Sequence, residues 1–141
     1  MILLSIHPEF VDKIRSGEKK FEFRTRIPAS ILSDPLVAVY ATAPVGAVVG
    51  FFRVGRVLAL PPATLWEQTK GAAGIARGRF RAYFKGRAMA YALEIAEWHE
   101  FAHHCSLETL RGSSAPPQSF AILTSEQRRR VMRRATKGEG K

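Results

Sequence analysis

Cysteine is almost absent from the chain. Cys105 is the only cysteine among 141 residues, so an internal disulfide is excluded and the protein is not a disulfide-stapled secreted scaffold. No apolar run reaches the roughly 18 residues that a membrane-spanning helix needs, because Arg53 and Arg56 interrupt the longest one, residues 45–60. The N-terminus also lacks the basic leader of a signal peptide. We therefore expect a cytoplasmic protein without a membrane partner.

Acidic residues are few as well. The chain holds 12 Asp and Glu against 22 Lys and Arg, a net charge of +10 with a pI near 10.5. Residues 68–93 contain no acid and six basic side chains, and residues 125–141 carry half of the net charge. A field of this sign favours phosphate-rich partners such as RNA or DNA.

The order of expected elements indicates the fold class. Composition and length are those of one globular domain with an ordinary core. Strands are expected over residues 2–6, 20–24, 36–41, 45–60, 88–101 and 118–123, and helices over 8–16, 64–70, 75–85, 106–110 and 125–134. Gly46, Gly50 and Gly55 suggest bulges in the long fourth strand. Because the helices do not follow a repeating βαβ pattern, we predict an α+β fold, a small mixed β-barrel with flanking helices.

The basic C-terminal segment is expected to stand apart from that barrel. Residues 1–124 are predicted to form the domain, and residues 125–141 a basic helix or tail. Thr124 or Ser125 would cap the helix. The last residues, 137–141, are expected to be disordered.

The segment 17–24 (GEKKFEFR) is the most informative stretch for function. Gly17 allows a sharp reversal after a helix, and Lys19 follows at the joint with the next strand. Strand alternation places the two phenylalanines toward the core and Glu22 with Arg24 on the opposite face. A lysine, a glutamate and an arginine that converge there can bind a polar, anionic ligand. The alternative is an exposed strand edge whose charges compensate one another.

Together with residues 4–9 (LSIHPE) and 116–120 (PPQSF), this segment resembles the ASCH domain family. The family's Gly-x-Lys-x-x-x-x-Arg motif falls on Gly17, Lys19 and Arg24, and the resemblance covers roughly residues 1–124. It implies a PUA-like barrel with a cleft, lined by the Lys19 motif, for RNA or a modified nucleotide. The family includes RNA-linked regulators, a ribonuclease and an acetylcytidine amidohydrolase. Where the amidohydrolase branch has threonine three residues after the lysine, this chain has Glu22, which weakens that branch.

Binding alone demands less of the sequence than catalysis, so an RNA-binding protein for single-stranded RNA or a modified nucleotide is the favoured interpretation. If the protein is an enzyme, Lys19 would stabilise a phosphorane, Glu22 would move a proton and Ser119 would orient phosphate. A third interpretation is a DNA-binding regulator that uses the arginines of the tail. No cofactor is expected.

Basic and aromatic side chains elsewhere extend the predicted nucleic-acid surface. For phosphate and base contacts the candidates are Lys19, Arg24, Arg26, Arg77, Arg81, Lys85, Gln118, Ser119, Arg129 and Arg133, with Tyr40 and Trp66 for stacking. The structural alternative for the basic helices is a merely solvated face. His99, His103, His104 and Cys105 match no common zinc spacing, so no metal site is expected.

Overall fold

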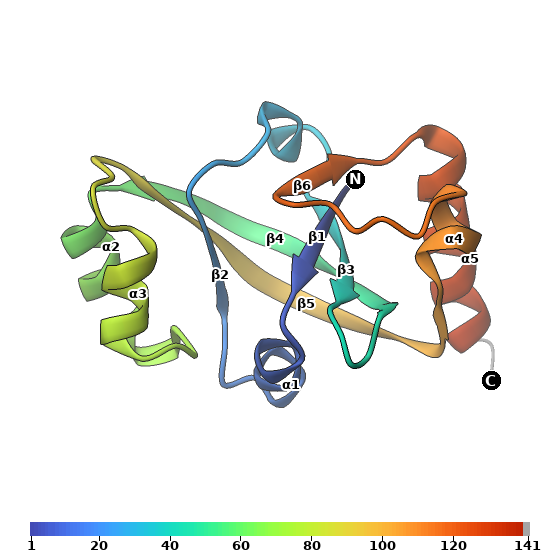
Figure 1. Cartoon of the computed structure of the whole chain (residues 1–141), viewed down its shortest axis with the longest axis horizontal. Coiled ribbons are helices and arrows are strands. Elements are labelled where there is room, and N and C mark those ends of the chain that lie inside the picture. Colours follow the sequence, from blue (N-terminus) through green and yellow to red (C-terminus); the bar gives the residue numbers. More distant parts are fainter. Residues whose placement is uncertain (140–141) are drawn as a thin grey trace.

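A six-stranded mixed sheet that curls into a half-barrel forms the centre of the molecule (Figure 1). The structure is a computed structural model that describes residues 1–139, with side chains described through residue 135. The strand order is β2-β5-β4-β3-β1-β6, in which only β1 and β3 run parallel. The strands are β1 (Ile2–Ile6), β2 (Phe21–Arg24), β3 (Leu36–Ala41), β4 (Ala47–Leu60), β5 (Ala90–Cys105) and β6 (Phe120–Ile122). The predicted α+β class with a small mixed barrel and flanking helices is confirmed, with the barrel only half closed.

The curl of the sheet comes from its two long strands. β4 and β5 pair antiparallel, and their register shifts near Gly50 and again between Val54 and Val57. An added Cβ at Gly50 would lie 2.3 Å from the carbonyl oxygen of His99, so only glycine allows the two backbones this close. Bulges of this kind bend and twist a strand, as expected for Gly50 and Gly55.

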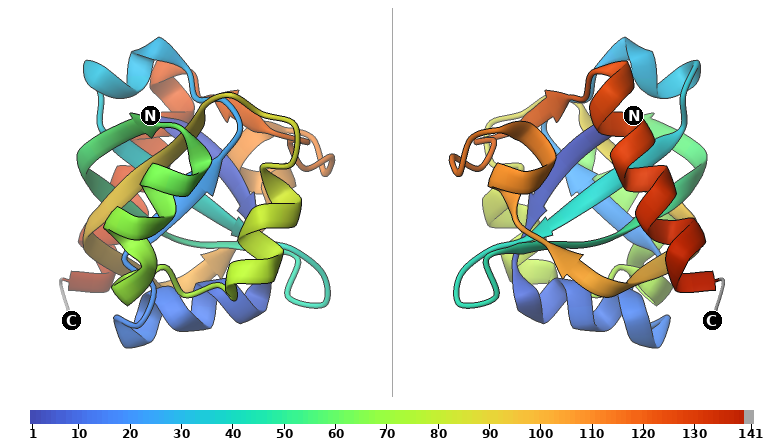
Figure 2. Two further views of the ribbon diagram at one scale, coloured as in Figure 1. Left: turned by 90° about the vertical axis from the view of Figure 1, so that its left-hand side faces the viewer. Right: turned by 90° about the vertical axis from the view of Figure 1, so that its right-hand side faces the viewer.

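Helices cover the two ends and one side of the sheet (Figure 2). In the views, α2 (Pro62–Thr69) and α3 (Arg77–Tyr83) lie at one end, and α4 (Leu107–Arg111) and α5 (Ser125–Glu139) lie at the other. The remaining helix is α1 (Pro8–Ser16), and the 3₁₀ turns are η1 (Ala29–Leu32) and η2 (Lys70–Ala72). Each expected helix and strand is present, with its ends within five residues of the prediction. Within the described part of the chain, no helix combines the length and apolar character needed to cross a bilayer.

The C-terminal helix belongs to the core. Val131 is 1% exposed and packs with Phe101 and Leu110 in one apolar cluster, which also includes Ala135. The helix extends five residues beyond the predicted end at Arg134, to Glu139, and residues 140 and 141 of the expected disordered end lie outside the described residues. Its apolar stripe is therefore a packing face, and removal of the whole helix would expose the core.

Tyr83 departs from the predicted arrangement of the third helix. Helical periodicity alone places Tyr83 on the apolar side with Phe80 and Phe84, yet it is 44% exposed whereas those two phenylalanines are buried. Phe80 and Phe84 pack edge-on against Phe23 of β2, and Tyr83 is not part of this cluster. The Tyr83 ring therefore remains at the surface, on the side of α3 that faces β1.

Because α5 is part of the core, we expect Val131→Ala to lower the free energy of unfolding by about 2 kcal/mol. Arg133→Ala changes an exposed side chain on the same helix and should stay within about 0.5 kcal/mol of the wild type. Urea unfolding followed by circular dichroism measures both. Equal stabilities of the two variants would show that α5 does not contribute to the core.

Candidate functional site

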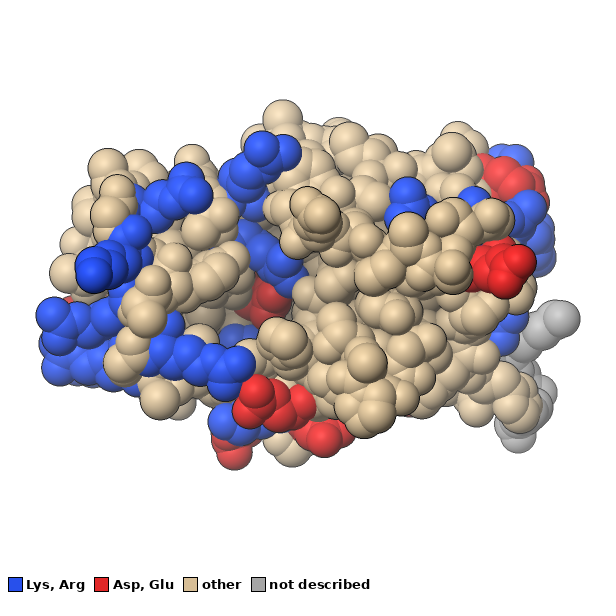
Figure 3. All heavy atoms as spheres, in the orientation of Figure 1, with Lys and Arg blue, Asp and Glu red and all other residues tan. Residues whose placement is uncertain are grey.

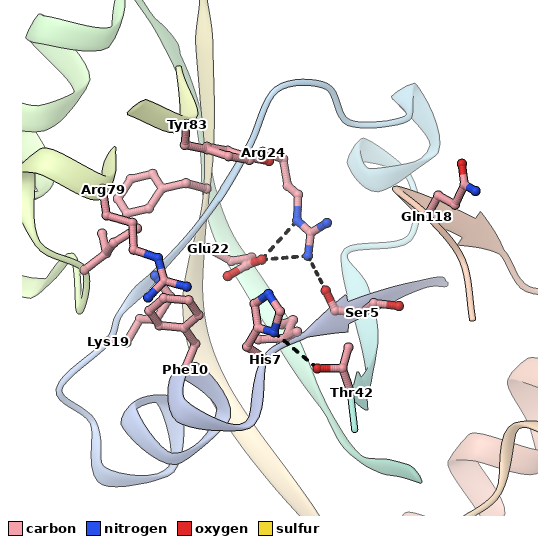
Figure 4. Close-up of a pocket in the computed structure, with 13 residues that line it drawn as sticks. Ser5, His7, Phe10, Lys19, Glu22, Arg24, Thr42, Arg79, Tyr83 and Gln118 are labelled. Carbon is pink, nitrogen blue, oxygen red and sulfur yellow. Dashed lines mark hydrogen bonds and ion pairs between the residues drawn. The ribbon is translucent and has the colours of Figure 1, made fainter. Parts of the chain in front are cut away.

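A cleft of about 390 Å³ opens where β1 ends and α1 begins, between β2 and α3 (Figure 4). Its walls come from segments far apart in the chain, which the curl of the sheet brings together. The lining residues are Ser5, Ile6, His7, Phe10, Lys19, Glu22, Phe23, Arg24, Thr42, Ile75, Arg79, Tyr83 and Gln118. The motif of residues 17–24 therefore contributes to a concave site. The alternative of an exposed strand edge is wrong, because Lys19 and Glu22 are only 3% and 7% exposed.

Lys19 is a buried cation set against aromatic rings. Its Nζ donates a 2.8 Å hydrogen bond to the carbonyl oxygen of Ala73 and lies 4.8 Å and 5.3 Å from the ring centroids of Phe23 and Phe10. Burial is the main cause that lowers the pKa of Lys19 below its ordinary value, while attraction to Glu22 acts in the opposite direction. The lysine thus needs less free energy to lose its proton than a surface lysine does.

Two glycines set the backbone around that lysine. Gly17 ends α1 with a φ of 81°, and its N–H caps the helix at the carbonyl of Ile14, which turns the chain back toward Lys19. Gly74 has a φ of 65°, and a Cβ there would lie 2.4 Å from the Cβ of Lys19. The chain therefore passes close over Lys19 only because residue 74 has no side chain.

Arg24 bridges the seam of the half-barrel, which is the open side where β2 faces β1 without backbone pairing. Its Nε and one terminal nitrogen hold Oε2 of Glu22, at 3.0 Å and 2.8 Å. The guanidinium also donates to the carbonyl oxygens of Ser5, at 2.8 Å, and Ser119, at 3.2 Å. β2 is not a neighbour of β1 or β6 in the sheet, so this one side chain joins three segments. Most of its donors are used inside the protein, and its main effect on the site is to position Glu22.

Glu22 keeps one carboxylate oxygen for a ligand. Oε2 accepts from Arg24, whereas Oε1 accepts no hydrogen bond from any described residue. Because the carboxylate lines the cleft, an incoming hydroxyl or amine can donate to Oε1. The site thus combines a buried ammonium group with an available carboxylate oxygen.

Two ionisable groups of this cleft, His7 and Arg79, were not predicted from the sequence, whereas Tyr83 is one of the aromatic side chains that the sequence offers for stacking. His7 precedes α1 and is exposed, and its Nδ1 lies 3.3 Å from the hydroxyl of Thr42. Arg79 lies 4.6 Å above the ring of Phe10 and forms an ion pair with Glu9. Tyr83 follows Arg79 by one helical turn, and both point toward the cleft (Figure 4). Their shared face of α3 was the available signal, since residues four apart lie on one side of a helix.

Of the four other residues predicted around the cleft, one lines it and three do not. Gln118 lines the cleft, whereas Ser119 is bound to Arg24 through its carbonyl oxygen and is not among the lining residues. Arg26 lies outside the cleft wall, 5.3 Å from the ring centroid of Phe120. Tyr40 packs against the apolar cluster under α4 and α5, so it does not contribute to this cleft.

The predicted basic residues fall into two separate groups. Arg77 and Arg81 line a second cavity of about 340 Å³ beside Trp66, and Lys85 is exposed just beyond α3 without lining either cavity. Arg129 and Arg133 lie on α5 at the other end of the molecule, each in an ion pair with Glu126. Figure 3 shows Lys and Arg gathered over the α2–α3 end, beside a hollow with acidic atoms inside it.

The histidine-rich end of β5 does not assemble a metal-ligand set. His99 and His104 lie near Glu97 and Glu100, respectively. Among the side chains described, through residue 135, no three of His, Cys, Asp or Glu gather in an arrangement that would hold a metal ion.

The sequence and the fold both match known proteins. The family model described as ASCH domain matches residues 4–108. The chain is 33% identical over 133 residues to a protein from Zymomonas mobilis named "ASCH domain-containing ribonuclease", covering 92% of this chain and 88% of that protein.

Solved structures extend the comparison. A crystal structure of the ASCH protein from Zymomonas mobilis aligns with a TM-score of 0.84 at 32% identity, over 94% of this chain and 93% of that one. The N-terminal domain of McrB from Staphylothermus marinus aligns with a TM-score of 0.60 at 10% identity, over 94% and 93% of the two chains. The second match shows a shared fold alone.

The ion pair of Arg24 with Glu22 can be compared with a surface pair of the same chemistry. The side chains of Arg24 and Glu22, taken without their backbone atoms, are 12% and 9% exposed, whereas those of Arg56 and Glu94 are 64% and 29% exposed. Both pairs have a 2.8 Å contact. We expect Arg24→Met to cost about 3–5 kcal/mol, because it leaves a buried carboxylate unpaired. Arg56→Met should cost much less, because solvent screens this exposed pair.

A double-mutant cycle with Glu22→Gln, followed by urea unfolding, measures this coupling. The second substitution should recover part of the loss in Arg24→Met. Additive effects of the two substitutions would contradict a direct coupling between Arg24 and Glu22.

The buried charge of Lys19 predicts a specific pH dependence of stability. The native pKa lies below the ordinary 10.5, so above it the unfolded chain holds more protons than the native one. Stability relative to Lys19→Met should therefore rise as the pH increases from neutral toward 10.5, and then level off. Urea midpoints of both proteins across that range provide the test, and a difference that stays flat or shrinks with pH would contradict it.

Proposed function

Since this chain belongs to the ASCH domain family, we propose that it binds single-stranded RNA in the Lys19 cleft and cleaves the phosphodiester bound there. The observation that carries the proposal is the convergence of the Lys19 ammonium, the available Oε1 of Glu22 and the His7 imidazole on one cleft. The ribonuclease name of the Zymomonas relative supports the same chemistry. A DNA-binding role has no support from the comparisons, and two of the α5 arginines named for it are paired with Glu126.

The reaction that fits these groups is an internal transesterification. Glu22 takes the proton of the ribose 2′-hydroxyl, and the resulting oxygen attacks the adjacent phosphorus. The bond from phosphorus to the 5′-oxygen breaks, and protonated His7 supplies a proton to that leaving oxygen. The products are a 2′,3′-cyclic phosphate and a 5′-hydroxyl. DNA lacks the attacking 2′-hydroxyl, so this reaction cannot cleave it.

Positive charge stabilises the transition state of this step. The ammonium of Lys19 lies in a low-dielectric environment, where its attraction to the doubly charged phosphorane is stronger than in water. Arg79 at the rim of the cleft adds a second positive charge. Arg24 holds Glu22 in place. The role of Ser119 in orienting phosphate stays a prediction, because Ser119 does not line the cleft.

The dimensions of the cleft favour single-stranded substrate. A volume of about 390 Å³ is that of a small-molecule pocket and not of a groove for a duplex. Tyr83 and Phe10 line it and offer aromatic faces for an unpaired base. Such RNA is found in the cytoplasm, the location predicted from the sequence.

Cleavage is tested on an end-labelled single-stranded RNA and on the same strand with every 2′-hydroxyl methylated. We expect wild-type protein to bind both and to cut only the first. Glu22→Gln should reduce kcat about 10²–10⁴-fold, the usual contribution of a general base. His7→Asn and Lys19→Met should also reduce kcat, and Arg56→Met, at an exposed pair outside the cleft, should leave it unchanged.

The outcomes separate the possible functions. Products with a 2′,3′-cyclic phosphate support the proposal. Binding without cleavage would make the protein a reader of RNA or of a modified nucleotide, and the proposed chemistry would be wrong. Cleavage that survives Glu22→Gln and Lys19→Met would place the active site elsewhere.

A further inference from the structure

We propose that the second cavity, between α2 and α3, is a nucleobase subsite that holds another base of the RNA strand whose phosphate lies in the Lys19 cleft. The cavity is called the Trp66 pocket here, and its lining residues are Pro62, Ala63, Trp66, Glu67, Arg77, Phe80 and Arg81. The inference rests on the proposed function for the strand that reaches it. A nucleobase that binds there requires both a flat apolar surface and a nearby positive charge for its phosphate.

The flat apolar surface is provided by the indole of Trp66, which packs against the buried ring of Phe80. The ring centroids of Trp66 and Phe80 are 5.0 Å apart, and Phe80 is 1% exposed. Edge contacts with Phe23 and Phe84 hold the Phe80 ring in place. Trp66 is only half-buried, so part of its indole remains available to a ligand. Stacking on a ring that is already held costs little conformational entropy.

The positive charge is provided by two arginines one helical turn apart. Arg77 and Arg81 are exposed, and neither donates a hydrogen bond or forms an ion pair within the described residues. In contrast, Arg56, Arg79 and Arg129 are each paired with a glutamate. A phosphate that binds Arg77 and Arg81 therefore displaces no internal ion pair.

Glu67 adds an acceptor at the edge of the pocket. Its carboxylate is paired with Lys70 at 2.7 Å. The exocyclic amino group of a base can donate to this carboxylate, whereas the carboxylate repels a phosphate. The pocket thus favours a base near Glu67 and a phosphate near the arginines.

Helix α3 is the wall that the two cavities share. Arg79 and Tyr83 line the cleft, and Arg77 and Arg81 line the Trp66 pocket. The members of each pair are four residues apart, so they share one side of the helix. The two pairs are offset by two residues, a rotation of about 200°, so they lie on opposite sides. An α-helix is roughly 10–12 Å wide with its side chains. A strand that crosses this basic helix reaches both cavities, and residues 68–93 contain no acid to repel it.

The first test uses the intrinsic fluorescence of the pocket. The chain has two tryptophans, so Trp98→Phe leaves Trp66 as the only one. Titration with 5′-AMP should quench its emission saturably, and ribose 5-phosphate, which lacks a base, should not. Absence of quenching by 5′-AMP, or equal quenching by both compounds, would overturn a stacking site at Trp66.

The second test measures whether the Trp66 pocket binds the same RNA strand as the Lys19 cleft. Trp66→Ala should weaken binding of a 2′-O-methylated ten-nucleotide RNA about 5–100-fold, which corresponds to the loss of one stacked base. The paired change Arg77→Ala with Arg81→Ala should also weaken it, while the exposed, unpaired Arg53 provides the matched control Arg53→Ala. In cleavage assays, the pocket variants should raise KM and leave kcat unchanged. Trp66→Phe keeps an aromatic ring, so it should retain most of the affinity and separates stacking from folding.

The outcomes distinguish this inference from the proposed function. If wild-type protein cleaves RNA and the pocket variants bind the decamer as tightly as Arg53→Ala does, the subsite is wrong and the cleft chemistry stands. If 5′-AMP quenches Trp66 and the pocket variants weaken decamer binding, but no RNA is cleaved, the base subsite is supported and the proposed cleavage fails. A loss of kcat in the pocket variants would overturn a binding subsite separate from the catalytic groups.

Discussion

The contact that Arg24 makes across the seam determines the geometry of the whole site. The sheet is only half closed, and its edge strand β2 has no backbone partner on the side of β1. A single guanidinium crosses that gap to two carbonyl oxygens, and it also binds Glu22 of its own strand. Arginine suits the task because its planar group presents five donors in fixed directions and stays charged. The cleft exists because the seam is held by a side chain, which leaves an opening that a backbone ladder would fill.

Burial of charge gives the cleft its chemistry. Lys19 and Glu22 are less exposed than many apolar residues of this protein, and charges with so little solvent normally destabilise a fold unless they are paired. Here Arg24 neutralises Glu22, and two aromatic rings with the carbonyl of Ala73 stabilise the ammonium of Lys19. The same low dielectric strengthens the interaction of these groups with a phosphate. A site that costs stability in the free protein is therefore prepared for an anionic ligand.

The distribution of basic residues is more informative than their number. Several arginines of α5 are paired with Glu126, and Val131 anchors that helix in the core. The arginines of α3 are distributed between two cavities, and Arg77 and Arg81 keep their donors available. A net charge of +10 attracts RNA to the protein generally. In the proposed complex, a strand would bind beside these unpaired arginines and the neighbouring aromatic rings.

The sequence by itself determined the helices and strands and the central motif, because both depend on local patterns. Alternation placed Glu22 and Arg24 on one face of β2, and Gly17 indicated the reversal that brings Lys19 to the joint. Only the tertiary structure decided what those side chains meet. The fold placed His7, Arg79 and Tyr83 in the cleft. It packed Tyr40 against the apolar cluster under α4 and α5. It also brought the carbonyl oxygens of Ser5 and Ser119 within hydrogen-bond distance of Arg24. Periodicity within a segment determines which residues share a face. Which faces meet depends on the strand order and curl of the sheet, set by contacts between residues far apart in the chain.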